Sequence, residues 1–452
     1  MRTRTRLVFI FCLALLAHLA FSPAALAQQP VTVTIQQGAI GPTGVYAIRN
    51  ARIITVTGPL IENGTVIIRN GRIEAVGPDA PVPAGAEEID ARGLNVYPGM
   101  IDAGTSLGLV EIPGGASGTV DVAEVGDLNP NAQAVFAINP HSAHVAVTRV
   151  NGITSVLTLP TGGVISGQAA LINLNGTSPR ELALIPSAAL VINFPRLSST
   201  GGEFFSPQQT SNLTEAVQAS NRQVEQMRKL MRDAEAYGRA QDAYARDARL
   251  PRPDQSVLLS ALVPFVRGER PVIIRAERES EIRSALRFAE EMRLKPVILG
   301  GNDAWKVAAL LKERNVPVIL TGLWNLPMRE DDAYDVLYEN AARLQQAGVR
   351  FCISTGNSGA NVRDLPYQAG MAASFGLSRD EALKSVTLYP AQILGVADRM
   401  GSIEPGKLAN LVITDGDLLE ARTHVRYLFI EGRRIPLTSR HTELYEMFKD
   451  RR

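Results

Sequence analysis

Residues 96–109 read VYPGMIDAGTSLGL, and at this stretch the pattern of the chain changes. Before it, short runs rich in Ile, Val and Thr predict small β-strands; after it, apolar runs alternate with helical stretches. That alternation is typical of parallel strands covered by helices. Counting the run that begins at 96, the chain has eight such apolar runs. Eight strands of this kind predict an α/β fold, namely a (β/α)8 TIM-like barrel. The predicted strands cover 96–102, 153–159, 169–174, 188–193, 272–276, 296–299, 317–321 and 350–353.

The two ends of the chain predict a second, smaller unit. Strands expected over 65–69 and 72–76 flank Asn70-Gly71, a dipeptide favoured in two-residue hairpin turns. We expect residues 45–98 and 401–436 to form one composite β-sandwich domain beside a barrel that covers 99–400. A helical insertion is expected near 211–250, where apolar side chains recur at helical spacing. Residues 437–452 are expected to form a C-terminal tail.

The first 27 residues read as a secretory signal peptide. Arg2, Arg4 and Arg6 precede an apolar run over 7–21, and the stretch ends in Ala25-Leu26-Ala27. The run is shorter than the roughly 20 apolar residues that span a bilayer, which disfavours a membrane anchor. We therefore expect an exported protein, periplasmic or secreted, without membrane attachment after cleavage.

Composition excludes several classes of protein. The formal net charge is +1, whereas a nucleic-acid-binding surface needs a surplus of Lys and Arg. Two cysteines cannot build a disulfide scaffold, and only Cys352 remains after cleavage. A homo-oligomer is possible: the amphipathic stretch at 211–250 is either a lid or oligomer surface or, as we favour, a helix that covers the barrel.

Three segments carry a family resemblance. They are GTVIIRNGRIEAVG at 64–77, the stretch at 96–109, and GLSRDEALKSVTLYPAQILGVADRMGSIEPGKLANLVI at 376–413. Together they resemble the amidohydrolase superfamily, especially its imidazolonepropionase-like, metal-dependent hydrolases. The resemblance implies a hydrolase that acts on non-peptide C–N bonds, in amides or cyclic amides, or on related esters. It also implies zinc or another divalent metal at the barrel mouth, where it activates water.

The residues at the ligand places differ from that expectation. The resemblance implies two histidines after the first strand, which fall at Gly104 and Ser106, and histidines on strands five and six, which fall at Arg275 and Gly300. The aspartate implied after strand eight falls near Asn357. The lysine implied on strand four has no counterpart, because the first lysine of the chain is Lys229, well beyond that strand. Glycine has no donor atom and arginine stays protonated, so neither ligates a cation. We therefore predict no metal cofactor, and the metal mechanism lacks its residues.

Four histidines remain in the mature chain, and two of them offer a possible substitute site. His141 and His144 are three residues apart, a spacing that on a helix places both on one face. A metal site built on this pair and an acid is one interpretation. The favoured one is a solvated or hydrogen-bonded pair, and His424 and His441 are expected at the surface.

Polar residues near the strand ends are the candidates for ligand binding and catalysis. We predict a small-molecule ligand at the barrel mouth, contacted by Ser106, Arg275, Asn357, Asn361 and Arg363. Arg275 suits a carboxylate or phosphate, or pairs with an acid such as Asp102 or Glu277. Asp102 and Asp364 are the candidate catalytic bases. Two functions stay open: a hydrolase of the amidohydrolase type, or a metal-free pseudoenzyme that binds a ligand or partner.

Overall fold

The computed structural model describes residues 40–112, 117–195, 213–357 and 359–451. The predicted signal peptide lies outside these residues. Among the described helices, none combines the length and the apolar character needed to cross a membrane.

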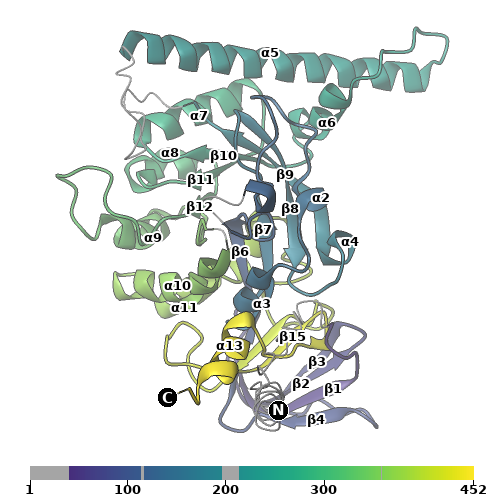
Figure 1. The fold of residues 1–452 in the computed structure, drawn as a ribbon, viewed down its shortest axis with the longest axis vertical. Coiled ribbons are helices and arrows are strands. Elements are labelled where there is room, and N and C mark those ends of the chain that lie inside the picture. Colours follow the sequence, from purple (N-terminus) through teal and green to yellow (C-terminus); the bar gives the residue numbers. More distant parts are fainter. Residues whose placement is uncertain (1–39, 113–116, 196–212, 358, 452) are drawn as a thin grey trace, which may run out of the picture. The chain divides into compact units, whose positions relative to one another are not determined.

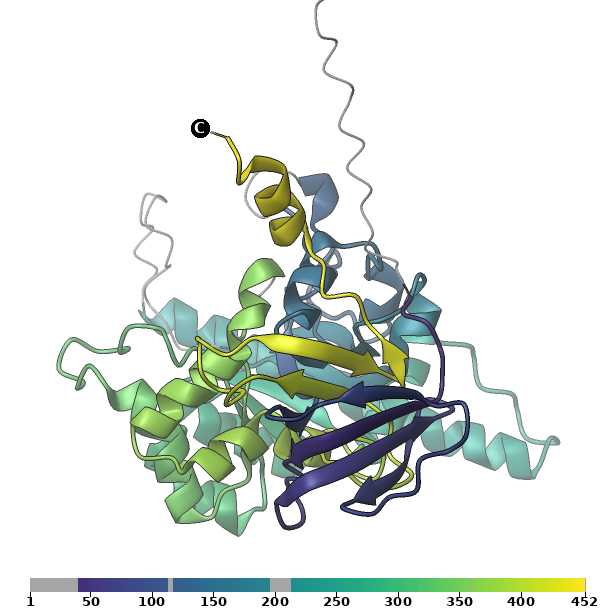
Figure 2. The ribbon, with the colours of Figure 1, turned by 90° about the horizontal axis from the view of Figure 1, so that it is seen from below.

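The segments from the two ends of the chain form one hydrogen-bonded sheet with its own apolar core. Its order is β16-β15-β14-β5-β1-β2-β3, with β4 also paired to β1. Figure 2 shows the purple N-terminal strands beside the yellow C-terminal ones. Asn70 and Gly71 both have positive φ, as a type I′ hairpin turn requires. The strands are β1 Tyr46–Ile53, β2 Ile61–Arg69, β3 Arg72–Gly77, β4 Glu87–Asp90, β5 Asn95–Pro98, β14 Leu411–Thr414, β15 Val425–Ile430 and β16 Arg433–Arg434.

A second sheet of eight strands curves into the barrel, which confirms the predicted fold (Figure 1). Its order follows the chain from β6 to β13, and each predicted apolar run overlaps one barrel strand. The first run, 96–102, also covers most of β5, which belongs to the other sheet. The strands are β6 Met100–Thr105, β7 Ile153–Thr158, β8 Ile165–Asn173, β9 Ala183–Asn193, β10 Val272–Ala276, β11 Pro296–Gly300, β12 Val318–Leu320 and β13 Phe351–Ile353.

The strand β8 departs from the expected parallel arrangement. It is antiparallel to both β7 and β9, whereas the other neighbouring pairs in the barrel are parallel. Residues 159–164, which join β7 to β8, are too few for the crossover helix that a parallel pair needs. The chain therefore turns back in a hairpin, in which Gly162 and Gly163 adopt positive φ.

Helices cover the outside of the barrel, and α5 occupies the expected insertion (Figure 1). Ser378 accepts a hydrogen bond from the backbone of Glu381, which caps α11. The helices are α2 Ala134–Ala137, α3 Ala143–Arg149, α4 Pro179–Leu182, α5 Leu213–Arg246, α6 Val257–Val266, α7 Glu279–Glu291, α8 Ala308–Glu313, α9 Val336–Ala347, α10 Leu365–Ser374, α11 Arg379–Ser385, α12 Leu388–Ile393 and α13 Arg440–Phe448, with 3-10 turns η2 Ser117–Thr119, η3 Ala304–Val307 and η4 Gly359–Asp364.

Two apolar clusters separate the inside of the barrel from its outside. Alternate strand residues such as Val191, Ile273 and Cys352 pack in the interior, whereas their neighbours Ile192 and Ile274 pack against the helices. Because side chains alternate along a strand, the last inward residue of each strand is fixed by this register. The register therefore determines which residues face the barrel mouth.

Candidate functional site at the barrel mouth

Arg275 lies near the C-terminal end of β10, the fifth barrel strand. It follows Ile273 by two residues, and Ile273 belongs to the interior cluster, so Arg275 is directed to the same side. In register it stands beside Asn193 of β9 and Leu299 of β11. The candidate arginine thus lies at the end of the barrel where ligands bind in this fold.

Asn193 is a functional candidate that sequence reasoning missed. Its Oδ1 accepts a hydrogen bond from Arg275 Nε at 3.3 Å, and its Nδ2 donates to the Gly163 carbonyl oxygen at 2.8 Å and to Ser166 Oγ at 3.0 Å. One amide therefore joins the guanidinium to the Gly-rich loop after strand two. The available signal was an asparagine as the last residue of the predicted fourth strand.

Asp102 is enclosed at the joint between the first and last strands. Its Oδ2 accepts hydrogen bonds from Thr355 Oγ1 at 2.5 Å and from Thr355 N at 3.2 Å, and its Oδ1 accepts from Gly104 N at 3.2 Å and from Ser354 Oγ. The side chain is completely buried. Burial raises the pKa of Asp102, although these hydrogen bonds act in the opposite direction. Burial, together with the charge of Asp102, also raises the pKa of the neighbouring Cys352 thiol.

The place of the first expected histidine is filled by neighbouring side chains. A Cβ atom added at Gly104 would lie 2.9 Å from Ser354 Oγ, 3.0 Å from Leu299 Cδ1 and 3.5 Å from Ile319 Cγ2. Side chains of β11, β12 and the residue that follows β13 therefore pack against this glycine, and a larger side chain would have to displace them.

The place of the histidine expected on strand six is closed for a different reason. Gly300 has a φ of +104°, and an added Cβ would lie 2.3 Å from Glu277 Oε1. A side chain there would be strained by its backbone conformation and would collide with a carboxylate. Gly300 is thus favoured by its backbone conformation, and Gly104 by the close contacts around it.

Ser106 and Asn357 are brought together at the mouth. The Ser106 amide donates to the Asn357 carbonyl oxygen at 3.2 Å, and the Ser106 hydroxyl donates to the Leu159 carbonyl oxygen at 3.2 Å. The Asn357 side chain donates to the carbonyl oxygen of Thr355 at 2.9 Å. Both side chains are half-buried and stabilise the loop that follows β13.

The rest of that loop runs away from Arg275, to the outside of the barrel. Arg363 lies 2.8 Å from the His441 ring of α13, and its carbonyl oxygen accepts from Asn151 at 2.8 Å. Asp364 is half-buried beside Arg363, and burial raises its pKa. Asn361 is exposed on η4. The structure therefore places the second half of the predicted ligand-binding set against α3 and α13, because η4 packs on α3.

The two neighbouring histidines do not share a helix face. His141 precedes the helix cap and is exposed, whereas His144 lies in the first turn of α3, where its Nε2 is 2.9 Å from the Glu111 carbonyl oxygen. His424 is exposed beside Asp415 at 3.1 Å. Over the described ranges, no three His, Cys, Asp or Glu side chains are grouped closely enough to hold a metal ion.

The residues at the mouth do not fit a divalent metal. Glycines stand at two of the expected ligand places, and a guanidinium, which carries positive charge, stands at a third. Two carboxylates lie beside these glycines, since Asp102 accepts from Gly104 N and Glu277 is close to Gly300. The other side chains there are amides, hydroxyls and one cation. Such groups can donate hydrogen bonds to a carbonyl or carboxylate oxygen, which is the chemistry that this arrangement can supply.

Comparisons with known proteins agree with this architecture. A model of the amidohydrolase family matches residues 303–436. An imidazolonepropionase of Mesorhizobium japonicum is 26% identical over 84% of this chain and 94% of its own length. An imidazolonepropionase of Acidiphilium cryptum is 25% identical over 82% and 93%. The crystal structure of an amidohydrolase from Thermotoga maritima superposes with a TM-score of 0.77 at 24% identity, covering 86% of this chain and 99% of that one.

Proposed function

We propose that this chain, which is similar to amidohydrolases along most of its length, is a hydrolase of non-peptide C–N bonds, in amides or cyclic amides, or of related esters. The observation that carries the proposal is its alignment with an imidazolonepropionase along 94% of that relative's length. Coverage of this extent includes both the barrel and the sheet domain. The finer part of the proposal is that the substrate binds at the barrel mouth without a resident divalent metal.

Arg275 has the central role in this proposal. Its guanidinium binds the carbonyl oxygen of the substrate and stabilises the negative charge that develops there during hydrolysis. Asn193 holds the guanidinium in place through the 3.3 Å hydrogen bond to Nε. Of the two candidate bases, Asp102 is occupied by the joint between strands. Asp364 keeps 21% of its side chain accessible but belongs to η4, which packs on α3 away from Arg275, so the proposal assigns the proton transfer to neither aspartate.

A second candidate function is a metal-free binding protein derived from the same fold. The close packing at Gly104 and the guanidinium at strand five favour it, because these features replace metal ligands without supplying another source of activated water. In this case Arg275 would hold a carboxylate-bearing ligand, and no bond would be cleaved.

The proposal also includes export to the periplasm or medium. It rests on the basic, apolar and small-residue segments of the first 27 residues. Mass spectrometry of the protein from a periplasmic fraction should then find Gln28 as the new N-terminus. An uncleaved chain in the cytoplasm would contradict this part.

The deciding experiment combines turnover with metal analysis on protein purified after expression of the full chain. Hydantoin, a simple amide and an ester are offered, with and without EDTA and added Zn²⁺. We expect hydrolysis that is insensitive to EDTA and falls at least about tenfold in Arg275→Ala, the loss expected from removing one stabilising donor. The matched control is Arg270→Ala, at the opposite end of the same strand, where Nη1 contacts Ser187 Oγ at 2.8 Å.

Each outcome separates the alternatives. Stoichiometric zinc with loss of activity in EDTA overturns the metal-free mechanism. Equal activity of wild type and Arg275→Ala overturns the role given to Arg275. Saturable binding of a carboxylate without turnover of any substrate class supports the binding protein instead.

A further inference from the structure

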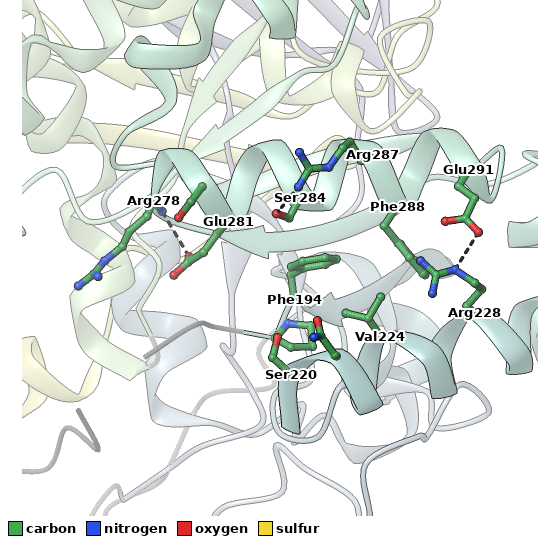
Figure 3. A pocket seen from close by; sticks show the side chains of 13 residues that line it. Phe194, Ser220, Val224, Arg228, Arg278, Glu281, Ser284, Arg287, Phe288 and Glu291 are labelled. Atoms are coloured by element: carbon green, nitrogen blue, oxygen red, sulfur yellow. Dashed lines mark hydrogen bonds and ion pairs between the residues drawn. The ribbon is translucent and has the colours of Figure 1, made fainter. Parts of the chain in front are cut away.

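A cavity of about 380 Å³ lies between α5 and α7, outside the barrel ring (Figure 3). One wall is the face of α5 that carries Ser220, Val224 and Arg228, and the other is the face of α7 from Ser280 to Glu291. Its volume is within the range of small-molecule sites. We call this cavity the α5–α7 groove.

The floor of the groove is aromatic and lies next to the barrel mouth. Phe194 and Phe288 meet edge to face, with their ring centroids 6.1 Å apart. The backbone amide of Phe194 donates to the Arg275 carbonyl oxygen at 3.2 Å. A ligand in the groove would therefore place an apolar group on these rings, just beyond the ends of strands four and five.

Two of the arginines that line the groove lack a carboxylate partner in the described part of the chain. Arg228 is neutralised by Glu291 at 2.8 Å, which closes one end of the groove. Glu281 accepts backbone hydrogen bonds from Glu277 and Arg278, at 2.9 and 3.3 Å. Arg287 contacts Ser284 Oγ at 3.0 Å, and Arg278 stands at the other end of the groove. Figure 3 shows Arg278 at the opposite end of α7 from the Glu291–Arg228 pair.

We propose that the α5–α7 groove binds a monocarboxylate with an aromatic or acyl body. Its apolar part would rest on Phe194 and Phe288, and its carboxylate would pair with Arg278 or Arg287, whose planar guanidinium groups match a carboxylate. Three arginines and two glutamates line the groove, so its formal charge is +1, which suits a monoanion better than a phosphate dianion. The hydroxyls of Ser220, Ser280 and Ser284 can bond an amide or other polar group of the ligand.

The test is isothermal titration calorimetry of the full-length expressed protein with N-benzoylglycine, which carries a ring, an amide and one carboxylate. N-benzoylglycinamide is the neutral counterpart. We expect saturable binding of the acid that weakens about tenfold in Arg278→Gln or Arg287→Gln, the size expected when one charge-assisted bond is lost. N-benzoylglycinamide should bind the wild-type protein no more tightly than N-benzoylglycine binds either variant. Ser284→Phe, which fills the groove, should abolish binding of both compounds.

Two matched controls locate the site. Arg283→Gln removes an arginine from the exposed side of α7, where it pairs with Glu279 at 2.9 Å, and should leave the affinity unchanged. Arg275→Ala should also leave it unchanged, so failure here is distinguishable from failure of the proposal for the barrel mouth. Absence of binding, equal affinity for the neutral compound, or equal weakening by Arg283→Gln overturns the proposal. If Arg275→Ala is the variant that loses binding, while Arg278→Gln and Arg287→Gln bind normally, the probe binds at the barrel mouth and the proposal for the α5–α7 groove is overturned.

Discussion

The Asp102 carboxylate of the first barrel strand accepts a 2.5 Å hydrogen bond from the Thr355 hydroxyl, directly after the last strand. No backbone ladder joins β6 to β13 among the described residues, since these strands are the two ends of the sheet order. Side-chain hydrogen bonds therefore close the barrel at this joint. The same bonds explain why an aspartate within the family-like motif is buried here, with its oxygens already occupied by hydrogen bonds.

Removing the hydroxyl partners of Asp102 should destabilise the fold. Thr355→Val leaves a buried carboxylate with one donor fewer, and we expect a loss of about 1.5–3 kcal/mol in the free energy of unfolding, the range for hydrogen bonds to charged groups. Denaturant unfolding followed by circular dichroism measures it. Thr355→Ser retains the hydroxyl and should stay close to wild type; an equal loss in both variants would contradict the assignment.

Restoring the histidines of the family pattern should not restore a metal site. In Gly104→His, Ser106→His the new side chain at 104 meets Ser354 and Leu299, so we expect destabilisation of at least about 1–3 kcal/mol, as for overpacked cores. Elemental analysis should find no stoichiometric zinc. The single variant Ser106→His, at a half-buried position, is the control. A stable double variant with one bound zinc per chain would contradict this prediction, because it would show that the contacts around Gly104 rearrange to admit a histidine.

Glu404 should make part of the free energy of unfolding depend on pH. Hydrogen bonds from Ser402, Lys407 and Thr57 lower the pKa of Glu404 to about 2. A lowered pKa stabilises the fold above the unfolded pKa of about 4.3, and this contribution is lost as the pH falls through about 2. Because Glu404 is 43% exposed, we expect the effect to stay below about 1 kcal/mol. Glu404→Gln should flatten the stability profile between pH 5 and 2 as measured by thermal unfolding, whereas Glu62→Gln should not.

His441 should titrate below its ordinary value. Partial burial lowers the pKa of His441, with the charges of Arg363 and His144 acting in the same direction. The unfolded chain then binds the proton more readily, so this contribution to stability is present above about pH 6.5 and declines as the pH falls below it. NMR titration of the ring protons measures the pKa. Arg363→Gln should move it upward, and an unchanged pKa would contradict the contact between η4 and α13.

Much of the fold could be predicted from patterns local to each segment. Alternating apolar runs located the barrel strands, and Asn70-Gly71 located a hairpin, because side-chain periodicity and turn chemistry depend on a few adjacent residues. The reversal of β8 was missed, although the short connection from Thr158 to Ile165 was visible in the sequence. The sequence also predicted composite use of both chain ends without specifying which strands pair.

The candidate site was predicted only in part, since its geometry depends on contacts between distant segments. The sequence by itself determined which groups are available: glycine, serine and arginine at ligand places, which lack the donors that a metal requires. Only the tertiary structure decided where they act. It joins Asn193 to Arg275, encloses Asp102 between two strands, and directs Arg363 to His441 outside the barrel. Residue chemistry is a local property, whereas burial and partnership are set by the register of strands that the chain brings together from far apart.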